Sequence, residues 1–276
     1  MDNEKKVTLL EEKQDVVEKQ EKKYTFATTQ VSLPSMGKLY SKDHPLHNVD
    51  FIDLKEMTAR EEDILTSKIL LKKGIAIDRL LENCIVDKKI NHQNLLVGDR
   101  NTILLALRIS GYGPEYNINI TCPECNTSQE SEIMLDKINI KTLDVEPQEI
   151  GLNEFEFKLP KSQALIKFKL LTSGEESDIA KTQDNLRKLT KSDTENLVTS
   201  RMLKQIISVN GNSDRRYILD FINNMHIFDS RAFRQYITFI EPDVIMKSDF
   251  TCKECGELSS IDIPITTEFF WPSGNE

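Results

Sequence analysis

A chain of 276 residues, 38% of them hydrophobic, is long enough to bury the core of one large domain or two ordinary ones. Its net charge of −9 disfavours nucleic acid as the main partner, because nucleic-acid-binding proteins usually present a basic face to the phosphates. No apolar run approaches the roughly 18 residues of a membrane span, and the polar start Met1-Asp2-Asn3-Glu4 lacks the apolar stretch of a signal peptide. We therefore expect a cytoplasmic protein with no membrane partner.

Residues 1–30 are rich in Lys, Glu, Gln and Asp, and this composition predicts a flexible charged tail. Its apolar residues up to position 17 are Val7, Leu9, Leu10, Val16 and Val17. Such a tail either keeps the chain in solution or serves as a docking arm that becomes ordered on a partner. The sequence leaves both interpretations open.

The first structured unit is expected to begin near residue 31 with a loop that contains Pro34 and Gly37, followed by an alternating strand over residues 49–57. Thr58 and Glu61 then form a capping box that begins a helix. The apolar stripe predicted for this helix consists of Ile64, Leu65, Ile69, Leu70 and Leu71.

A second helix is predicted over residues 102–109, ending near Gly111 and Gly113. A hairpin follows, because residues 116–120 alternate with period two and residues 131–135 can form the returning strand. Its turn contains Cys122-Pro123-Glu124-Cys125.

The same order of features recurs in the second half of the chain. A strand over residues 165–171 precedes Thr172 and Glu175, which repeat the capping box at an offset of 114 residues. A helix over residues 232–240 then leads to Cys252-Lys253-Glu254-Cys255. The offset from Cys122 to Cys252 is 130 residues, larger than the 114 residues between the capping boxes. The difference of sixteen residues between the two offsets predicts an insertion within residues 177–195.

These repeats predict an α+β fold built by tandem duplication of a strand-helix-helix-hairpin unit. The first repeat would span residues 31–145 and the second residues 146–276. The alternative is chance similarity, because Thr-x-x-Glu caps are common.

Four of the five cysteines form two Cys-x-x-Cys pairs: Cys122, Cys125, Cys252 and Cys255. In a reducing compartment such pairs favour metal ligation over disulfides, and four thiolates are the ligands that tetrahedral structural zinc prefers. The pairs are 126 residues apart, so either both hairpin tips meet around one ion or each pair recruits other ligands. The single shared Zn²⁺ is the simpler hypothesis, and its role would be to fasten the two halves together.

Other interpretations of the cysteines are less favoured. A thioredoxin-type redox pair is expected at a helix N-terminus, whereas these pairs lie between strands. A catalytic zinc would need an open coordination position and usually His or carboxylate ligands. Reduced cysteines without metal remain an alternative. Cys84 lies in an apolar segment and is interpreted as a buried small hydrophobic residue.

No catalytic constellation is apparent in the sequence. The histidines at positions 44, 47, 92 and 226 are scattered, and there is no phosphate-binding loop and no nucleophile elbow. Asp99 and Asp229 are interpreted as caps or salt-bridge partners. The aromatic residues 269–271 must either pack on the core or be covered by a partner. We expect a protein that is not an enzyme.

Several motifs occur in an order that resembles the baseplate hub and hub-assembly proteins of T-even-type (T4-like) contractile-tailed bacteriophages. They are Leu33-Pro34-Ser35, Gly37-Lys38-Leu39-Tyr40, Met57-Thr58 with Glu61-Glu62, Leu96-Val97-Gly98-Asp99-Arg100, Tyr112-Gly113-Pro114-Glu115-Tyr116, Cys122-Pro123-x-Cys125, Ile263-Pro264-Ile265-Thr266 and Phe269-Phe270-Trp271-Pro272. The resemblance covers nearly everything from Val31 to Pro272.

This resemblance implies a non-enzymatic role as a baseplate hub subunit, or as an assembly factor or chaperone for other baseplate hub proteins. The chain would act in the host cytoplasm during assembly or in the tail baseplate of the virion. The alternative is a zinc-ribbon regulatory protein that binds nucleic acid or the transcription machinery, which would need a basic, aromatic face around the cysteines. The oligomeric state and the particular hub partner stay open.

Overall fold

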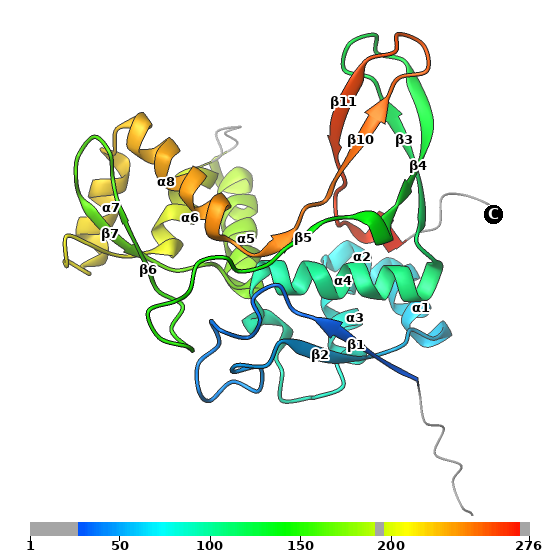
Figure 1. Cartoon of the computed structure of the whole chain (residues 1–276), viewed down its shortest axis with the longest axis horizontal. Coiled ribbons are helices and arrows are strands. Elements are labelled where there is room, and N and C mark those ends of the chain that lie inside the picture. Colours follow the sequence, from blue (N-terminus) through cyan, green and yellow to red (C-terminus); the bar gives the residue numbers. More distant parts are fainter. Residues whose placement is uncertain (1–26, 191–195, 271–276) are drawn as a thin grey trace, which may run out of the picture.

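The computed structural model describes residues 27–190 and 196–270, and it shows helices combined with small antiparallel sheets (Figure 1). This arrangement agrees with the expected α+β class. The helices form the main body, and two β-hairpins project from it side by side (Figure 1). Within the described residues, no helix is both long and apolar enough to cross a membrane.

The first half of the chain forms two antiparallel strand pairs around a group of helices. Its elements are β1 (Thr28–Ser32), β2 (Phe51–Lys55), α1 (Ala59–Thr66), α2 (Lys68–Lys73), α3 (Ala76–Cys84), η1 (His92–Asn94), α4 (Val97–Tyr112), β3 (Glu115–Thr121), β4 (Ser128–Met134), η2 (Leu135–Lys137) and β5 (Ile140–Lys141). Strand β1 begins at Thr28, so the last residues of the expected tail belong to a sheet. Residues 1–26 lie outside the described part.

The second half forms a three-stranded antiparallel sheet, β6-β7-β8, and the second projecting hairpin, β10-β11. Its elements are β6 (Phe155–Lys158), β7 (Leu165–Phe168), α5 (Ser173–Thr190), α6 (Leu197–Gln205), β8 (Ile206–Val209), α7 (Arg215–Asn223), α8 (Ile227–Ile240), β9 (Asp243–Val244), β10 (Lys247–Thr251), β11 (Leu258–Asp262) and η3 (Thr267–Phe270). The short strands β5 and β9 pair with each other and join the two halves.

Both predicted capping boxes are present. The Thr58 amide donates to Glu61 Oε2 over 2.9 Å at the start of α1. The Thr172 amide donates to Glu175 Oε2 over 3.2 Å, and the Glu175 amide donates to Thr172 Oγ1 over 3.3 Å, at the start of α5. These reciprocal bonds satisfy amides that would otherwise lack partners in the first helical turn.

Asp99 lies in the first turn of α4 and is fully buried. Its carboxylate accepts hydrogen bonds from the Ser35 amide (3.0 Å), the Ser35 hydroxyl (2.6 Å) and the Tyr40 hydroxyl (2.6 Å). Burial raises the pKa of Asp99 above its ordinary value, although these hydrogen bonds act in the opposite direction. Asp99 therefore anchors the Pro34-containing loop after β1 to the start of α4.

Asp229 has the corresponding position in the first turn of α8 and is also buried. It accepts from the amides of Lys161 (2.7 Å) and Ser162 (3.0 Å), in the loop that follows β6. Burial acts to raise the pKa of Asp229, but the hydrogen bonds from this loop lower it below its ordinary value. Both aspartates thus anchor loops from the first turn of a helix, which corrects their interpretation as helix caps or salt-bridge partners.

One continuous hydrophobic core includes side chains from both halves, among them Leu81, Leu104, Phe168 and Phe233. Backbone bonds also cross the junction, since the Ser173 amide donates to the Leu95 carbonyl over 2.8 Å. The two halves are therefore joined by packing and backbone pairing, independently of the projecting hairpins.

The C-terminal aromatic residues pack onto the first half. Phe269 and Phe270 are 0% and 1% exposed, and the Phe269 ring makes an edge contact with Tyr116 at a centroid distance of 5.3 Å. Arg108 Nε donates to the Phe269 carbonyl over 2.9 Å. Packing on the core is therefore confirmed for these two rings, and Trp271 lies outside the described residues.

The helix predicted after Thr58 needs correction. It is interrupted at Ser67, whose side chain accepts from the Leu70 amide and begins the separate helix α2. Of the predicted apolar stripe only Leu65 is buried, whereas Ile69 is 66% exposed. Helix α2 has no buried residue, so a period extended across Ser67 was wrong.

Candidate metal centre

Each projecting hairpin has the same turn at its tip. In the β3-β4 turn, the Cys122 amide donates to the Thr127 carbonyl (2.9 Å), and the Asn126 amide donates to the Cys122 carbonyl (3.0 Å). Asn126 has a φ of 57°, in the left-handed region that Asn tolerates better than most residues. The turn therefore curls the chain around the cysteine pair.

The β10-β11 turn repeats this pattern. The Cys252 amide donates to the Glu257 carbonyl (2.9 Å), and the Gly256 amide donates to the Cys252 carbonyl (3.0 Å). Gly256 has a φ of 74°, which glycine adopts without steric cost. The residue after the second cysteine thus has the left-handed conformation in both tips.

The two tips bring all four paired cysteines together. Their sulfur atoms lie within 4.8 Å of one another, with Cys122 Sγ 3.7 Å from Cys255 Sγ and Cys125 Sγ 3.6 Å from Cys252 Sγ. A disulfide would need about 2.05 Å. Four thiolates around one zinc ion, at about 2.3 Å each, would be about 3.8 Å apart. The spacing therefore fits shared ligation of one ion.

The burial of the thiols suits ligands held at a hairpin tip. Cys122 and Cys252 are buried beside Ile120 and Phe250 in a small apolar cluster, which Ile118 and Ile261 connect to the main core. Cys125 is exposed, and hydrogen bonds with Thr127 lower the pKa of its thiol to about 6. At Cys255, a hydrogen bond with Glu257 acts to lower the pKa of the thiol, but desolvation and hydrogen bonds with the other three cysteines outweigh it and raise this pKa to about 12. A metal must therefore displace the proton of this thiol to bind at neutral pH.

The composition of the group favours a structural rather than a catalytic ion. Among the residues that the structure describes, the possible ligands gathered here are these four cysteines. Four thiolates complete a tetrahedron, so no position is left open for water or substrate.

The charge of the hairpins does not favour a nucleic-acid ligand. Residues 115–134 and 247–262 contain eight acidic side chains and two basic ones, Lys247 and Lys253. A phosphate backbone would be repelled by this surface. The zinc-ribbon regulator considered from the sequence therefore gains no support.

A side-chain link between the hairpins was not foreseen. Gln129 on β4 accepts from the Lys253 amide (2.8 Å) and donates to the Thr251 carbonyl (3.3 Å). Nothing in the local sequence distinguishes this glutamine. By contrast, the offset that aligns Cys122 with Cys252 also aligns Asn126 with Gly256, and that signal indicates the shared turn conformation.

The remaining candidate residues lie elsewhere. Cys84 is fully buried, and burial raises the pKa of its thiol to about 12, which confirms its interpretation as a hydrophobic core residue. His92 is buried near Asp78 and Glu82, and His44 stacks on Tyr40.

Comparison with known families decides the relationship. The model of the family described as T4 bacteriophage base plate protein matches residues 25–271, nearly the whole chain. The chain belongs to this family. The resemblance noted from the sequence motifs is therefore confirmed at this level. No curated protein and no solved structure matches the chain significantly.

Membership identifies a phage baseplate protein. A baseplate protein is a tail component that contacts other phage structural proteins.

Proposed function

We propose that this protein is a non-catalytic component of baseplate hub construction, acting either as a hub subunit or as an assembly factor or chaperone. It works by contact with other hub proteins, in the host cytoplasm during assembly or in the finished tail. Its scaffold is stapled by one Zn²⁺ ion bound to Cys122, Cys125, Cys252 and Cys255. Sulfur spacing, an all-thiolate donor set and matching turns support the metal assignment.

We further propose that the scaffold arose by duplication of the unit predicted from the sequence. Lys55 pairs with the capping-box carboxylate of Glu61, and Lys169 pairs with that of Glu175, again at an offset of 114 residues. The anchoring aspartates, Asp99 and Asp229, are separated by the same offset as Cys122 and Cys252. Chance similarity of isolated caps does not account for matching pairs in one order.

The contacts also relocate the proposed insertion. Leu54 bridges Ile85 in the first half, and the residue aligned with Leu54 at the offset of 114, Phe168, pairs with Ile206 in the second. The two partners, Ile85 and Ile206, are 121 positions apart, which is seven more than the first offset of 114. Seven of the sixteen extra residues would therefore precede Ile206, and the other nine would follow it. Helix α7 lies in that later stretch, which the range 177–195 did not include.

The observation that carries the proposed function is an uneven distribution of exposed apolar side chains. Of the sixteen large hydrophobic residues that are exposed among the described residues, twelve lie after residue 145. Ile227, Phe228 and Phe239 on α8 are 72%, 58% and 64% exposed. Exposed apolar surface of this kind marks a protein interface. The second half is thus the side that meets partners.

The test is association of the purified full chain with purified baseplate hub proteins, measured by co-elution with mass determination. Changing Phe228→Ser together with Phe239→Ser should weaken association without loss of folding, because both rings are largely exposed. Ile69→Ser, at a 66% exposed site in the first half, is the matched control and should leave association unchanged. A chain that associates with no hub protein would refute the proposed function.

A further inference from the structure

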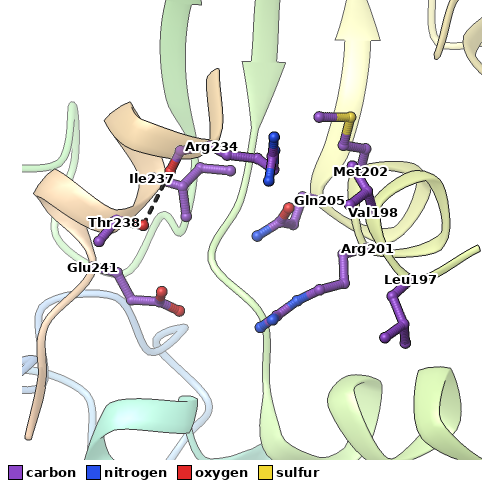
Figure 2. A pocket seen from close by; sticks show the side chains of 9 residues that line it. All are labelled: Leu197, Val198, Arg201, Met202, Gln205, Arg234, Ile237, Thr238 and Glu241. Atoms are coloured by element: carbon purple, nitrogen blue, oxygen red, sulfur yellow. Dashed lines mark hydrogen bonds between the residues drawn. The ribbon is translucent and has the colours of Figure 1, made fainter. Parts of the chain in front are cut away.

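A groove in the second half lies between α6 and α8 and encloses about 290 Å³ (Figure 2). Its apolar lining includes Leu197 and Val198 from α6 and Ile237 from α8. The side chains of Leu197 and Val198 are 40% and 41% exposed. Aliphatic side chains of a bound segment would be removed from water by contact with this lining, which is favourable.

The groove is also cationic. Arg201 and Arg234 reach into it from opposite sides (Figure 2). Arg201 pairs with Glu176 at 3.0 Å, whereas Arg234 and its neighbour Arg231 have no ion pair within the part of the chain that the structure describes. In a chain with a net charge of −9, such arginines indicate an acidic ligand.

The carboxyl group at one end of the groove compensates this charge only in part. The pKa of Glu241 is raised to about 7, mainly by burial and secondly by the negative charge of Asp243. Near neutral pH this group is therefore only partly ionised. The groove thus combines an apolar lining with a net positive rim, and it fits aliphatic side chains that stand next to carboxylates.

The N-terminal arm, residues 1–26, contains this pattern in Leu9-Leu10-Glu11-Glu12. The arm is joined to the described fold at Ala27, just before β1. The seventeen residues from Leu10 to Ala27 can span up to about 60 Å when extended. A compact chain of this length has a radius of gyration of about 19 Å, so the arm can reach the groove although β1 and α6 lie in different parts of the body (Figure 1).

We propose that residues 9–12 of the arm dock in the α6–α8 groove of the same chain. The two leucines cover Leu197, Val198 and Ile237, and the two glutamates face Arg201 and Arg234. Docking there would cover part of the apolar surface of the second half until another protein displaces the arm. The inference concerns the isolated chain and does not depend on which hub protein binds.

Photocrosslinking of the full-length chain tests this directly. A benzophenone amino acid placed at position 10 should crosslink to residues 197–205 or 234–241 within a single chain, as shown by the mass of the product and by peptide mapping. The same probe at position 3, outside the leucine-glutamate segment, should give little product in this groove. Product with the mass of two chains, product elsewhere on the fold, or no product would each overturn the proposal.

Charge reversal supplies the second measurement. Arg234→Glu should lower the yield roughly fivefold, because a partly exposed ion pair is worth up to about that factor. Combining it with Glu11→Arg and Glu12→Arg should restore the yield, which a change in folding alone would not do. Arg60→Glu, at an exposed arginine of α1, is the control and should have no effect. Equal yields in all variants would overturn the assigned contacts.

Discussion

Removal of the metal should unfold the tips of the two hairpins and leave the main body folded. The reason lies in the small size of the apolar cluster beneath the cysteines, where Ile120 and Phe250 are buried with the thiols Cys122 and Cys252, and Ile118 and Ile261 pack between this cluster and the main core. The large cluster connects both halves without contribution from the metal site. The metal therefore acts on the hairpins first.

The magnitudes support this local effect. Burial of Ile120 and Phe250 contributes about 3–6 kcal/mol, and the two bonds of Gln129 between the hairpins add about 2 kcal/mol. Isolated two-stranded hairpins are marginal in water. A structural zinc site contributes on the order of 10 kcal/mol in small peptides, so its loss removes the largest stabilising contribution there.

The assay is amide hydrogen exchange on the full chain with and without a chelator. Peptides from residues 118–131 and 248–261 should lose protection, while α4, α8 and the hairpin base at Tyr116 and Ile133, which belongs to the main core, retain theirs. Loss of protection throughout the chain would refute the claim that the core holds the halves together, and hairpins that stay protected would refute the metal as their staple.

Metal content completes the test of the shared site. The native chain should hold one zinc ion, and the pair of changes Cys252→Ser and Cys255→Ser should abolish it. Cys84→Ala, which removes a thiol outside the cluster, should leave the metal content unchanged. An ion that survives in the double variant, or two ions in the native chain, would refute ligation across the halves.

Four further predictions concern the body of the fold. Gly98→Ala should destabilise the chain by about 1–3 kcal/mol in denaturant unfolding, because a Cβ there would lie 1.9 Å from the Pro242 carbonyl oxygen. Arg108→Met should cost about 2–4 kcal/mol in the same measurement, since it removes donors to three carbonyl groups. Because the pKa of Asp99 is raised in the folded state, the native chain should lose stability as pH rises above the ordinary aspartate range. The Asp99→Asn variant should not show this loss. Because the pKa of Asp229 is lowered in the folded state, the native chain should also lose stability as pH falls, and the Asp229→Asn variant should not show this loss. Unfolding curves of both variants, measured over a range of pH, test these signs.

The parts of this fold that could be predicted from sequence are those indicated by patterns of neighbouring residues. Alternation over residues 116–120 and the Cys-x-x-Cys pair located the first hairpin, and Thr58 with Glu61 located the first residues of α1. The meeting of the two cysteine pairs needed the additional argument that duplicated hairpins come together. The four cysteines do lie together, but the duplication from which we predicted their meeting stays a proposal.

The parts that could not be predicted depend on tertiary contacts. Nothing near Asp99 shows that its partners are Ser35 and Tyr40, because those residues come from a loop about sixty positions away. The interruption at Ser67 was missed because the apolar residues on both sides keep a helical spacing. A polar residue that caps a new helix within such a pattern resembles an ordinary helical position.

The proposed duplication allows equivalent positions of the two halves to be compared. At the offset that aligns Cys122 with Cys252, Gly98 in the first turn of α4 aligns with Phe228 in the first turn of α8. Gly98 lies against the Pro242 carbonyl, where no side chain fits, whereas Phe228 is 58% exposed. If the halves are duplicates, this position has diverged: the first copy has no side chain where it meets the Pro242 carbonyl, and the second has a large apolar ring at the surface. That divergence is expected when one copy becomes the internal support and the other remains available to bind a partner.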